Sequence, residues 1–338
     1  MKQFYVQQNE AGQRLDKLLA KLLNKAPKSF IYKMLRKKNI TLNGRKADGS
    51  EKLAVQDEIK LFLSDETIGQ FSEAMITTEV EEDMDILYED SHILIVNKPL
   101  GILSQKADKE DVSMVEYIIS YLIRSKQITR EQLLSFKPAV CNRLDRNTGG
   151  ILIAGKSLLG LQEMARLLKS RSLNKYYLCI VKGKVGEKKR IEGYLSKDEE
   201  KNQVKIYAMP TETAEYICTE YEPLAHSRPV LTEASGLLQD QEPSGSYTLL
   251  QVKLITGRSH QIRAHLSSMG HPIVGDFKYG SQKTNHYFKK QYGLTHQLLH
   301  SYRMVFPKME GEFAYLSGKE FIAELPEQFL KIKDELFK

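Results

Sequence analysis

The stretch "NRLDRNTGGILIAGKS", residues 142–157, joins a charged turn to an apolar run. The run "GGILIAG" is typical of a buried strand. The turn places one carboxylate, Asp145, between Arg143 and Arg146. We therefore expect Asp145 at the lip of a sheet, where neighbouring positive charge keeps it ionised at neutral pH. Two interpretations stay open from the residues alone: an Asp–Arg ion pair that holds a turn, or a carboxylate that acts as a nucleophile or base.

Strand and helix patterns surround this stretch from about residue 84 onward. Apolar or β-branched runs predict strands within 85–96, 175–185 and 247–256, and amphipathic spacing predicts helices at 113–124 and 158–171. Several strand patterns follow one another at 177–220, which favours a mixed, largely antiparallel sheet over a doubly wound parallel one. The sequence has neither GxGxxG nor GxxxxGK[ST], so it offers no loop for a nucleotide cofactor.

A second polar cluster lies in "LITGRSHQIRAHLSSMGHPIVGDFKYG", residues 254–280. Five of its side chains gather at the expected start of a helix: Arg258, His260, Gln261, Arg263 and His265. Helix N-termini and basic side chains bind phosphate readily. The two histidines lack HExxH spacing and have no carboxylate or Cys beside them, so no metal is expected. His260 by itself is equally consistent with a core residue that orients a turn.

Adjacent tyrosines in the strand pattern "NKYYLCIVKG", residues 174–183, form a third patch. Successive side chains of a strand point to opposite faces. At most one of Tyr176 and Tyr177 can therefore face Asp145.

The excess positive charge of the chain is confined to its first fifth. The 338 residues carry a net charge of +7. Residues 1–65 hold 14 Lys and Arg against 7 Asp and Glu, and the remainder holds 36 of each kind. A compact basic module favours a polyanionic partner, most often nucleic acid, over a merely solvated surface.

Within that basic module, the pattern predicts two helices followed by a hairpin. Leucines from Leu15 to Leu23 recur at helical spacing, Pro27 interrupts the pattern, and "ITLNGRKA" at 40–47 predicts two strands around an Asn-Gly turn. Six bases cluster on the second helix and the hairpin: Lys33, Arg36, Lys37, Lys38, Arg45 and Lys46. We expect them to form one face that follows phosphates.

Two segments have the composition of connections. Residues 65–83 are acidic and polar, which predicts a linker. Residues 222–246 carry three prolines between strand patterns, which predicts a flexible flap. The three cysteines form neither a disulfide framework nor a CxxC site, and the sequence has no apolar stretch of membrane-spanning length, so a reduced, cytoplasmic protein without a membrane partner is expected.

Five motifs occur in a fixed order along the chain: "ILYEDSHILIVNKPLG", "RLDRNTGGILIAGKS", "KYYLCIVKG", "TGRSHQIRAHLSSMGHPIVGDFKYG" and "LLHSYRMVF". Together they resemble the RluA/RluC/RluD family of RNA pseudouridine synthases over roughly residues 84–307, and the basic module resembles the S4 RNA-binding domain. The chain looks closest to the RluC branch. The resemblance implies an α+β chain with an S4-like domain at 1–64, an acidic linker at 65–83, and a catalytic domain of pseudouridine synthase type at 84–338 with a mixed, largely antiparallel sheet.

The resemblance also implies a reaction. Specific uridines of RNA, foremost 23S ribosomal RNA, would be flipped out, cleaved at C1′–N1 and rejoined through C1′–C5, by a monomer that needs no cofactor and no metal. Three alternatives stay open: a synthase specific for transfer RNA, a non-catalytic RNA-binding factor, and a glycosidase-like hydrolase with Asp276 as its second acid.

Site residues follow from the same resemblance by position. Asp145 matches the catalytic aspartate, and Tyr177 matches a tyrosine that packs on the base and could help to remove the C5 proton. Arg263 would orient Asp145, in a bidentate pair where geometry permits. Arg143 would lie beside the flipped nucleotide. The glycines after Asp145 would let the RNA backbone approach closely.

Overall fold

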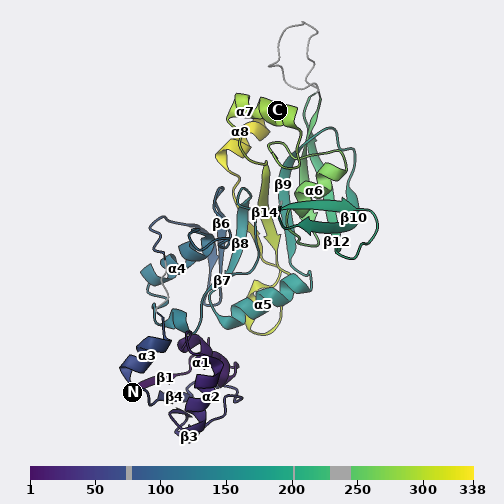
Figure 1. The fold of residues 1–338 in the computed structure, drawn as a ribbon. Coiled ribbons are helices and arrows are strands. Elements are labelled where there is room, and N and C mark those ends of the chain that lie inside the picture. The colour runs from purple at the N-terminus through teal and green to yellow at the C-terminus, as the bar shows by residue number, and fades with distance from the viewer. Residues whose placement is uncertain (74–77, 201, 229–244) are drawn as a thin grey trace.

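The chain folds into a small N-terminal unit and a larger unit built on one sheet (Figure 1). The computed structural model describes residues 1–73, 78–200, 202–228 and 245–338. The predicted α+β class, with a mixed and largely antiparallel sheet in the larger unit, is confirmed.

The N-terminal unit contains the two predicted helices, α1 (Leu15–Leu22) and α2 (Lys28–Arg36). Its sheet has the order β1-β4-β2-β3. The strands are β1 (Lys2–Tyr5), β2 (Ile40–Leu42), β3 (Arg45–Lys46) and β4 (Glu58–Leu61). Asn43 and Gly44 both have positive φ, 51° and 72°, as the predicted two-residue turn requires. The turn thereby sets β2 and β3 side by side and pairs Arg45 with Leu42.

Part of the segment predicted as a linker is helical. Helix α3 (Asp65–Phe71) begins after Ser64, whose hydroxyl accepts a hydrogen bond from the Thr67 N–H at 3.1 Å. Ile68 is buried in the core of the N-terminal unit, and the rings of Phe71 and Phe30 lie 4.2 Å apart. A helix this short has no apolar period that the sequence could reveal. Residues 65–71 therefore differ from the predicted linker, while the domain boundaries remain a prediction.

Within the described residues, two hydrogen bonds join the units. The Ser135 hydroxyl donates to Glu10 Oε1 at 2.6 Å, and the Leu158 N–H donates to Asn9 Oδ1 at 3.1 Å. Leu134 also packs against the N-terminal core. The N-terminal unit therefore sits against the start of the helix that follows Ser157, as Figure 1 shows.

The large sheet has the strand order β11-β10-β12-β13-β9-β14-β8-β6-β5. In addition, β7 pairs with β8, and β15 pairs with β14. Its strands are β5 (Asp85–Glu89), β6 (Ile93–Lys98), β7 (Ala139–Val140), β8 (Gly149–Gly155), β9 (Asn174–Lys182), β10 (Lys189–Asp198), β11 (Gln203–Tyr207), β12 (Glu215–His226), β13 (Tyr247–Leu254), β14 (Leu299–Val305) and β15 (Glu320–Ile322). Among these strands every described pairing is antiparallel except that of β14 with β8. The parallel pair brings the strand that follows Asp145 to the centre of the sheet.

The central strands are buried on both faces. Leu94 and Val96 of β6 pack with α4 (Met114–Arg124), whereas Ile93 and Ile95 pack with α5 (Leu158–Lys169) on the other face. The two-residue period of a strand separates these side chains, and a helix on each face explains why the sequence shows an uninterrupted apolar run.

Strand β14 explains the glycines after Asp145. A Cβ on Gly150, where φ is +107°, would lie 2.1 Å from the Ser301 carbonyl oxygen. A Cβ on Gly149 would lie 3.1 Å from His300 Nδ1. Both glycines are buried, so the predicted reason for them, a close approach of RNA, is wrong. The chain itself makes the close approach.

The remaining described helices are α6 (Gln261–Ser268), which packs against β11 and β12, α7 (Gln282–Tyr292), α8 (Glu327–Leu336), and the 3₁₀ turns η1 (Gln132–Leu134) and η2 (Gly311–Leu316). The prediction of a flap at 222–246 is wrong for its first residues, because β12 continues to His226. Its residues 229–244 lie outside the described residues. No helix in the described ranges is both long and apolar enough to span a bilayer.

Candidate active site

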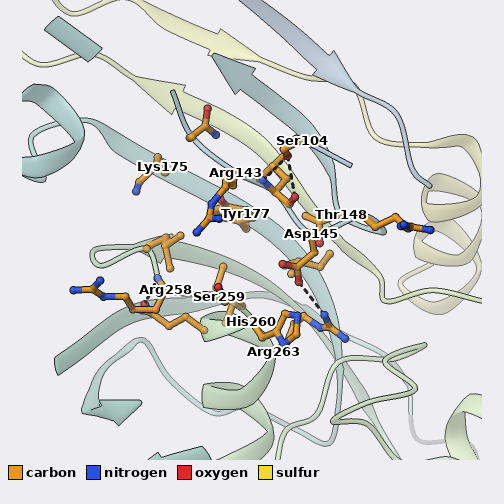
Figure 2. Close-up of a pocket in the computed structure, with 18 of the residues that line it drawn as sticks. Ser104, Arg143, Asp145, Thr148, Lys175, Tyr177, Arg258, Ser259, His260 and Arg263 are labelled. Carbon is orange, nitrogen blue, oxygen red and sulfur yellow. Dashed lines mark hydrogen bonds and ion pairs between the residues drawn. The ribbon is translucent and has the colours of Figure 1, made fainter. Parts of the chain in front are cut away.

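A cavity of about 1130 Å³ opens at the loop before β8 (Figure 2). Asp145, Tyr177, Arg263 and Arg143 all line it. They come from three segments of the sequence, at residues 143–145, 177 and 263, and the fold brings them together. The six N-terminal bases do not line this cavity.

Asp145 lies in a loop that is fixed on its N-terminal side by Ser104. The Ser104 hydroxyl donates to the Leu144 carbonyl and accepts from the Leu144 N–H, both at 2.9 Å. Leu144 is itself buried in the sheet core. With its neighbour held at both backbone groups, the backbone at Asp145 has little freedom to shift.

The C-terminal side of the loop is fixed by Thr148 and Arg146. The Thr148 N–H donates to the Asp145 carbonyl at 3.0 Å, and Gln297 Nε2 donates to the buried Thr148 hydroxyl at 3.1 Å. The Arg146 carbonyl accepts from Lys98 Nζ at 3.1 Å and from the Gly101 N–H at 3.0 Å. The catalytic candidate therefore sits on a rigid turn.

Lys98 is a buried cation behind this turn. Its ammonium donates to three carbonyl oxygens, those of Pro99 at 2.8 Å, Ile102 at 2.7 Å and Arg146 at 3.1 Å. Buried charges are tolerated where every donor is satisfied in this way. Lys98 therefore ties the end of β6 to the loop that carries Asp145.

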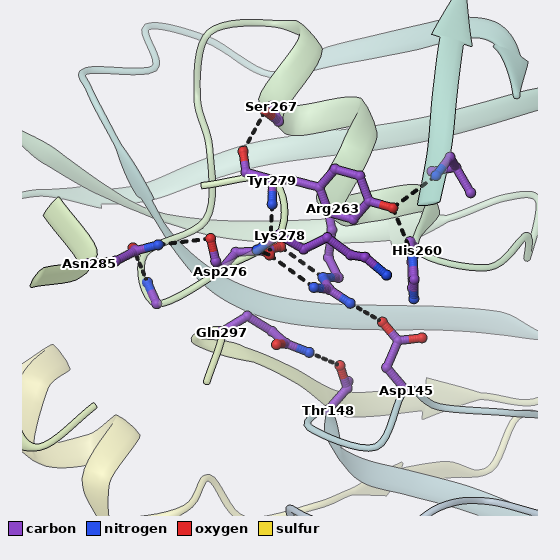
Figure 3. A network of polar contacts seen from close by, with 12 residues as sticks. Asp145, Thr148, His260, Arg263, Ser267, Asp276, Lys278, Tyr279, Asn285 and Gln297 are labelled. Atoms are coloured by element: carbon purple, nitrogen blue, oxygen red, sulfur yellow. Dashed lines mark hydrogen bonds and ion pairs between the residues drawn. The ribbon is translucent and has the colours of Figure 1, made fainter. Parts of the chain in front are cut away.

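Arg263 connects Asp145 to a second carboxylate (Figure 3). Its Nη1 donates to Asp145 Oδ2 at 2.8 Å, while Nε and Nη2 donate to Asp276 at 2.7 and 2.9 Å. The expected pairing of Arg263 with Asp145 is present, but the bidentate partner is Asp276. A single bond leaves Asp145 Oδ1 without a hydrogen-bond partner among the described residues, and the side chain is 27% exposed.

Asp276 is saturated. Besides Arg263, it accepts the N–H groups of Lys278 at 2.9 Å and Tyr279 at 3.0 Å, and it is 1% exposed. Burial would raise the pKa of Asp276, but the hydrogen bonds and charge of Arg263 and those two N–H groups hold it below its ordinary value. An ionised carboxylate with no exposed oxygen cannot serve as the general acid of a hydrolase, so the paired-acid alternative loses its second acid.

The side chain of Gln261 fixes the start of α6 by hydrogen bonds within the protein. Gln261 Oε1 accepts from the Thr256 hydroxyl at 2.8 Å and the Arg258 N–H at 3.1 Å. Its Nε2 donates to the Cys218 carbonyl and the Thr219 hydroxyl, both at 3.0 Å. Because Arg263 lies two residues further along the same helix, these four bonds also fix Arg263.

The two tyrosines of β9 separate as predicted. Tyr177 is buried in the sheet core and lines the cavity, whereas the Tyr176 ring lies on the other face with Arg303 Cζ 4.8 Å from its centroid. Burial, with the nearby charge of Asp145, raises the pKa of Tyr177 to about 12. Tyr177 is therefore neutral at pH 7. A neutral phenol is a poor base for the C5 proton, so the roles that remain for Tyr177 are packing and hydrogen bonding.

The cavity rim is basic. Arg143 is exposed, and neither an ion pair nor a hydrogen bond of its side chain occurs in the part of the chain that the structure describes. Lys175 and Arg258 lie on the same wall in Figure 2, and Arg258 pairs with Glu215 at 2.8 Å. These cations line the same cavity as Asp145, and their positive charge suits a phosphate-bearing ligand.

All six predicted N-terminal bases are exposed, and none forms an ion pair within the described ranges. They lie on α2, on the turn after it, and on β3. Their exposure and lack of partners fit the predicted phosphate-tracking face, which remains a prediction.

Sequence reasoning missed Ser104, Lys98 and Tyr279, and it assigned Asp276 a different task. The contacts that connect them to the Asp145 loop, to His260 and to Arg263 join residues 13 to 48 positions apart, so no local pattern reveals them. Lys98 did carry a signal, since a lone cation at the end of an apolar strand must find partners when buried. Among the described residues no group of three or more His, Cys, Asp or Glu is placed to hold a metal ion.

Comparisons with known proteins bear on the family and the fold of the chain. The family model described as RNA pseudouridylate synthase matches residues 92–268, and the S4 domain model matches residues 13–59. The ribosomal large subunit pseudouridine synthase D of Borreliella burgdorferi is 32% identical and covers 75% of this chain and 68% of its own length. The ribosomal large subunit pseudouridine synthase C of Vibrio vulnificus is 26% identical, and the match covers 98% of this chain and 95% of that protein. Among solved structures, human RNA pseudouridylate synthase domain containing 4 matches with a TM-score of 0.55 at 19% identity, over 75% of this chain and 92% of that one, which is a likeness of fold.

Proposed function

Because the chain belongs to the RNA pseudouridylate synthase family, we propose that it isomerises specific uridines of 23S ribosomal RNA to pseudouridine. The names of its bacterial relatives support ribosomal RNA as the substrate, and the S4 domain match supports RNA binding by the N-terminal unit. An enzyme with this substrate would act in the cytoplasm, which is the compartment we propose.

One observation carries the assignment of the reacting group. Asp145 offers a free carboxylate oxygen to a cavity large enough for a nucleotide, while Arg263 holds its other oxygen at 2.8 Å. The target uridine would leave its stack and enter this cavity, at a cost of about a few kcal/mol. Arg143 and the basic rim would bind the phosphates beside the flipped nucleotide.

In the proposed reaction the C1′–N1 bond breaks and its electron pair leaves with the base. Asp145 either attacks C1′ or removes a proton from the sugar, and the base then turns so that C5 bonds to C1′. The C5 proton is lost, N1 gains a proton, and any proton taken from the sugar is returned to it when C1′ bonds to C5, so product and substrate have the same atoms. Tyr177 would pack against the base as a neutral phenol, because burial keeps it protonated at pH 7.

Mapping pseudouridine in ribosomal and transfer RNA, with and without the gene, tests the function directly. We expect the loss of specific sites in 23S ribosomal RNA, and their return with the wild-type chain but not with Asp145→Asn. Loss of sites in transfer RNA alone would overturn the ribosomal assignment. Unchanged RNA in every class, together with retained RNA binding, would favour the non-catalytic RNA-binding factor.

A further inference from the structure

His260 occupies an unusual backbone position at the wall of the cavity. It has φ 54° and ψ 14°, in the left-handed region, and it directly precedes α6. Residues other than glycine rarely adopt this conformation, and they persist in it only where the surrounding structure holds them. The bend directs the imidazole to the cavity, which His260 lines together with Asp145.

Tyr279 determines which nitrogen of His260 carries the hydrogen. The Tyr279 hydroxyl accepts the Val204 N–H at 3.0 Å and lies 2.8 Å from His260 Nδ1. A hydroxyl has one hydrogen, and Nδ1 is the only acceptor within its reach among the described residues, so the geometry favours donation of that hydrogen to Nδ1. Nδ1 is then the acceptor, so we assign the imidazole hydrogen to Nε2.

Tyr279 is held firmly enough to maintain this assignment. Its N–H donates to Asp276 at 3.0 Å, its carbonyl accepts from Ser267 at 2.7 Å, and the Arg263 guanidinium lies 5.2 Å from its ring centroid. The same Arg263–Asp276 pair that positions Asp145 therefore also positions the residue that orients His260.

His260 is a neutral donor at physiological pH. Burial lowers its pKa, and the positive charges of Arg263 and Lys278 add to this, against the opposing carboxylates of Asp145 and Asp276. Nε2 has no hydrogen-bond partner within the part of the chain that is described. Figure 3 shows Asp145 and His260 on the same side of Arg263, with the second ring nitrogen directed away from Tyr279.

We propose that the His260 Nε2–H donates a hydrogen bond to a carbonyl oxygen of the flipped uracil and stabilises the charge that the base acquires when C1′–N1 breaks. This inference rests on the proposed function, and it gives His260 a catalytic role in place of the turn-orienting one. Whether Asp145 attacks the sugar or removes its proton, the electron pair leaves with the base and spreads over N1, O2 and O4. A fixed neutral donor strengthens its bond as that charge grows, so it favours the transition state over the bound substrate.

His260→Asn is the matched variant. Asparagine tolerates positive φ, and its Oδ1 can accept the Tyr279 hydrogen where Nδ1 did, but it has no counterpart of Nε2. We expect the single-turnover rate of pseudouridine formation to fall by about 10²-fold, with melting temperature and RNA affinity unchanged. A residue that only orients the turn would retain the wild-type rate in this variant.

Sulfur substitution in the RNA identifies the contact. Target RNAs carrying 2-thiouridine or 4-thiouridine present a poor acceptor at one carbonyl position at a time. For the wild-type chain, the thio substitution at the contacted position should slow the reaction, and in His260→Asn the same substitution should have little further effect. Should His260→Asn lower the melting temperature, His260→Gly replaces it, because glycine suits the positive φ, and added imidazole should restore part of its rate.

The outcomes separate the inference from the function on which it rests. Absence of pseudouridine with the wild-type chain overturns the proposed function and this inference with it. Wild-type turnover combined with an unchanged rate in His260→Asn overturns the inference alone. Equal sensitivity of both proteins to each thio substitution does the same. We expect His260→Asn to lose its sensitivity to the thio substitution at one of the two positions only. That position identifies the carbonyl oxygen that His260 contacts.

Discussion

Arg263 and Asp276 form a bidentate ion pair. It uses Nε and Nη2 of the guanidinium, whereas Nη1 donates to Asp145. The Nε–Oδ2 distance is 2.7 Å and the Nη2–Oδ1 distance is 2.9 Å, and both side chains are almost fully buried. Arg263 therefore presents one remaining nitrogen to Asp145 in a direction that Asp276 determines. Asp276, which does not line the cavity, thus sets the geometry of Asp145, which does.

Asp276→Asn should destabilise the protein by about 3–5 kcal/mol, because it leaves the buried Arg263 without its main partner. The folded-state pKa of Asp276 lies below its unfolded value, so its contribution is fully present above the unfolded pKa and is lost as pH falls through the folded one. Melting curves from pH 7 down to pH 3 should therefore show the wild-type advantage shrinking at the acid end. A constant difference in melting temperature across that range would contradict this account of the pair.

Asp145→Asn should abolish turnover and preserve binding. The amide keeps the shape but cannot act as a nucleophile or base, whereas Arg143 and the N-terminal bases still contact phosphates. RNA affinity should stay the same or tighten, because a negative charge that faces the RNA is gone. Single-turnover assays, RNA affinity and melting temperature on one preparation separate this from a structural role, in which stability, binding and activity would fall together. Substantial turnover with an unchanged melting temperature would remove Asp145 from the mechanism.

Two substitutions at Tyr177 separate its ring from its hydroxyl. Tyr177→Ala removes a ring from the sheet core and should cost about 3–5 kcal/mol of stability. Tyr177→Phe keeps the packing, so melting temperature and RNA affinity should remain, while the loss of the hydrogen bond that a neutral hydroxyl can donate in the cavity should lower the single-turnover rate by about 10²-fold. Wild-type turnover by Tyr177→Phe would restrict the role of Tyr177 to packing.

Lys98→Met should weaken the turn that carries Asp145. Methionine fills a similar volume but leaves the carbonyls of Pro99 and Ile102 without the donor they have now, which should cost about 2–3 kcal/mol. The rate should fall as well, because the Arg146 carbonyl loses the same ammonium. Melting temperature and single-turnover rate report the two effects. An unaltered rate in a destabilised protein would mean that Lys98 supports the fold without positioning Asp145.

Salt dependence tests the N-terminal basic face. Changing Lys37, Lys38 and Arg45 to Gln should reduce the slope of log affinity against log salt by up to about 2–3, since each phosphate contact contributes about 0.7–0.9. The control is a triple Gln variant at Lys283, Lys289 and Lys331, which are also exposed and lie on α7 and α8 at the far end of the molecule (Figure 1). Equal slopes in the two variants would show that the N-terminal face makes no special contact with RNA.

The order of motifs along the chain was sufficient for the family and the fold class, and it selected three residues, Asp145, Tyr177 and Arg263, that the structure places around one cavity. Apolar period located the strands and helices around Asp145, because a sheet covered on both faces requires continuous apolar runs and its covering helices require amphipathic ones. The Asn-Gly turn and the leucine spacing likewise sufficed for the helices and hairpin of the N-terminal unit. These are local properties, and the amino-acid order by itself expresses them.

Only the tertiary structure decided how the residues are paired. The bidentate partner of Arg263 is Asp276 and not Asp145, the glycines after Asp145 make room for β14 and not for RNA, and the tautomer of His260 depends on Tyr279 and Val204. Each of these contacts joins segments whose separation in the sequence carries no record of their distance in space. A hydrogen bond or a close approach depends on atoms within about 3 Å, and that proximity arises only when the sheet has assembled.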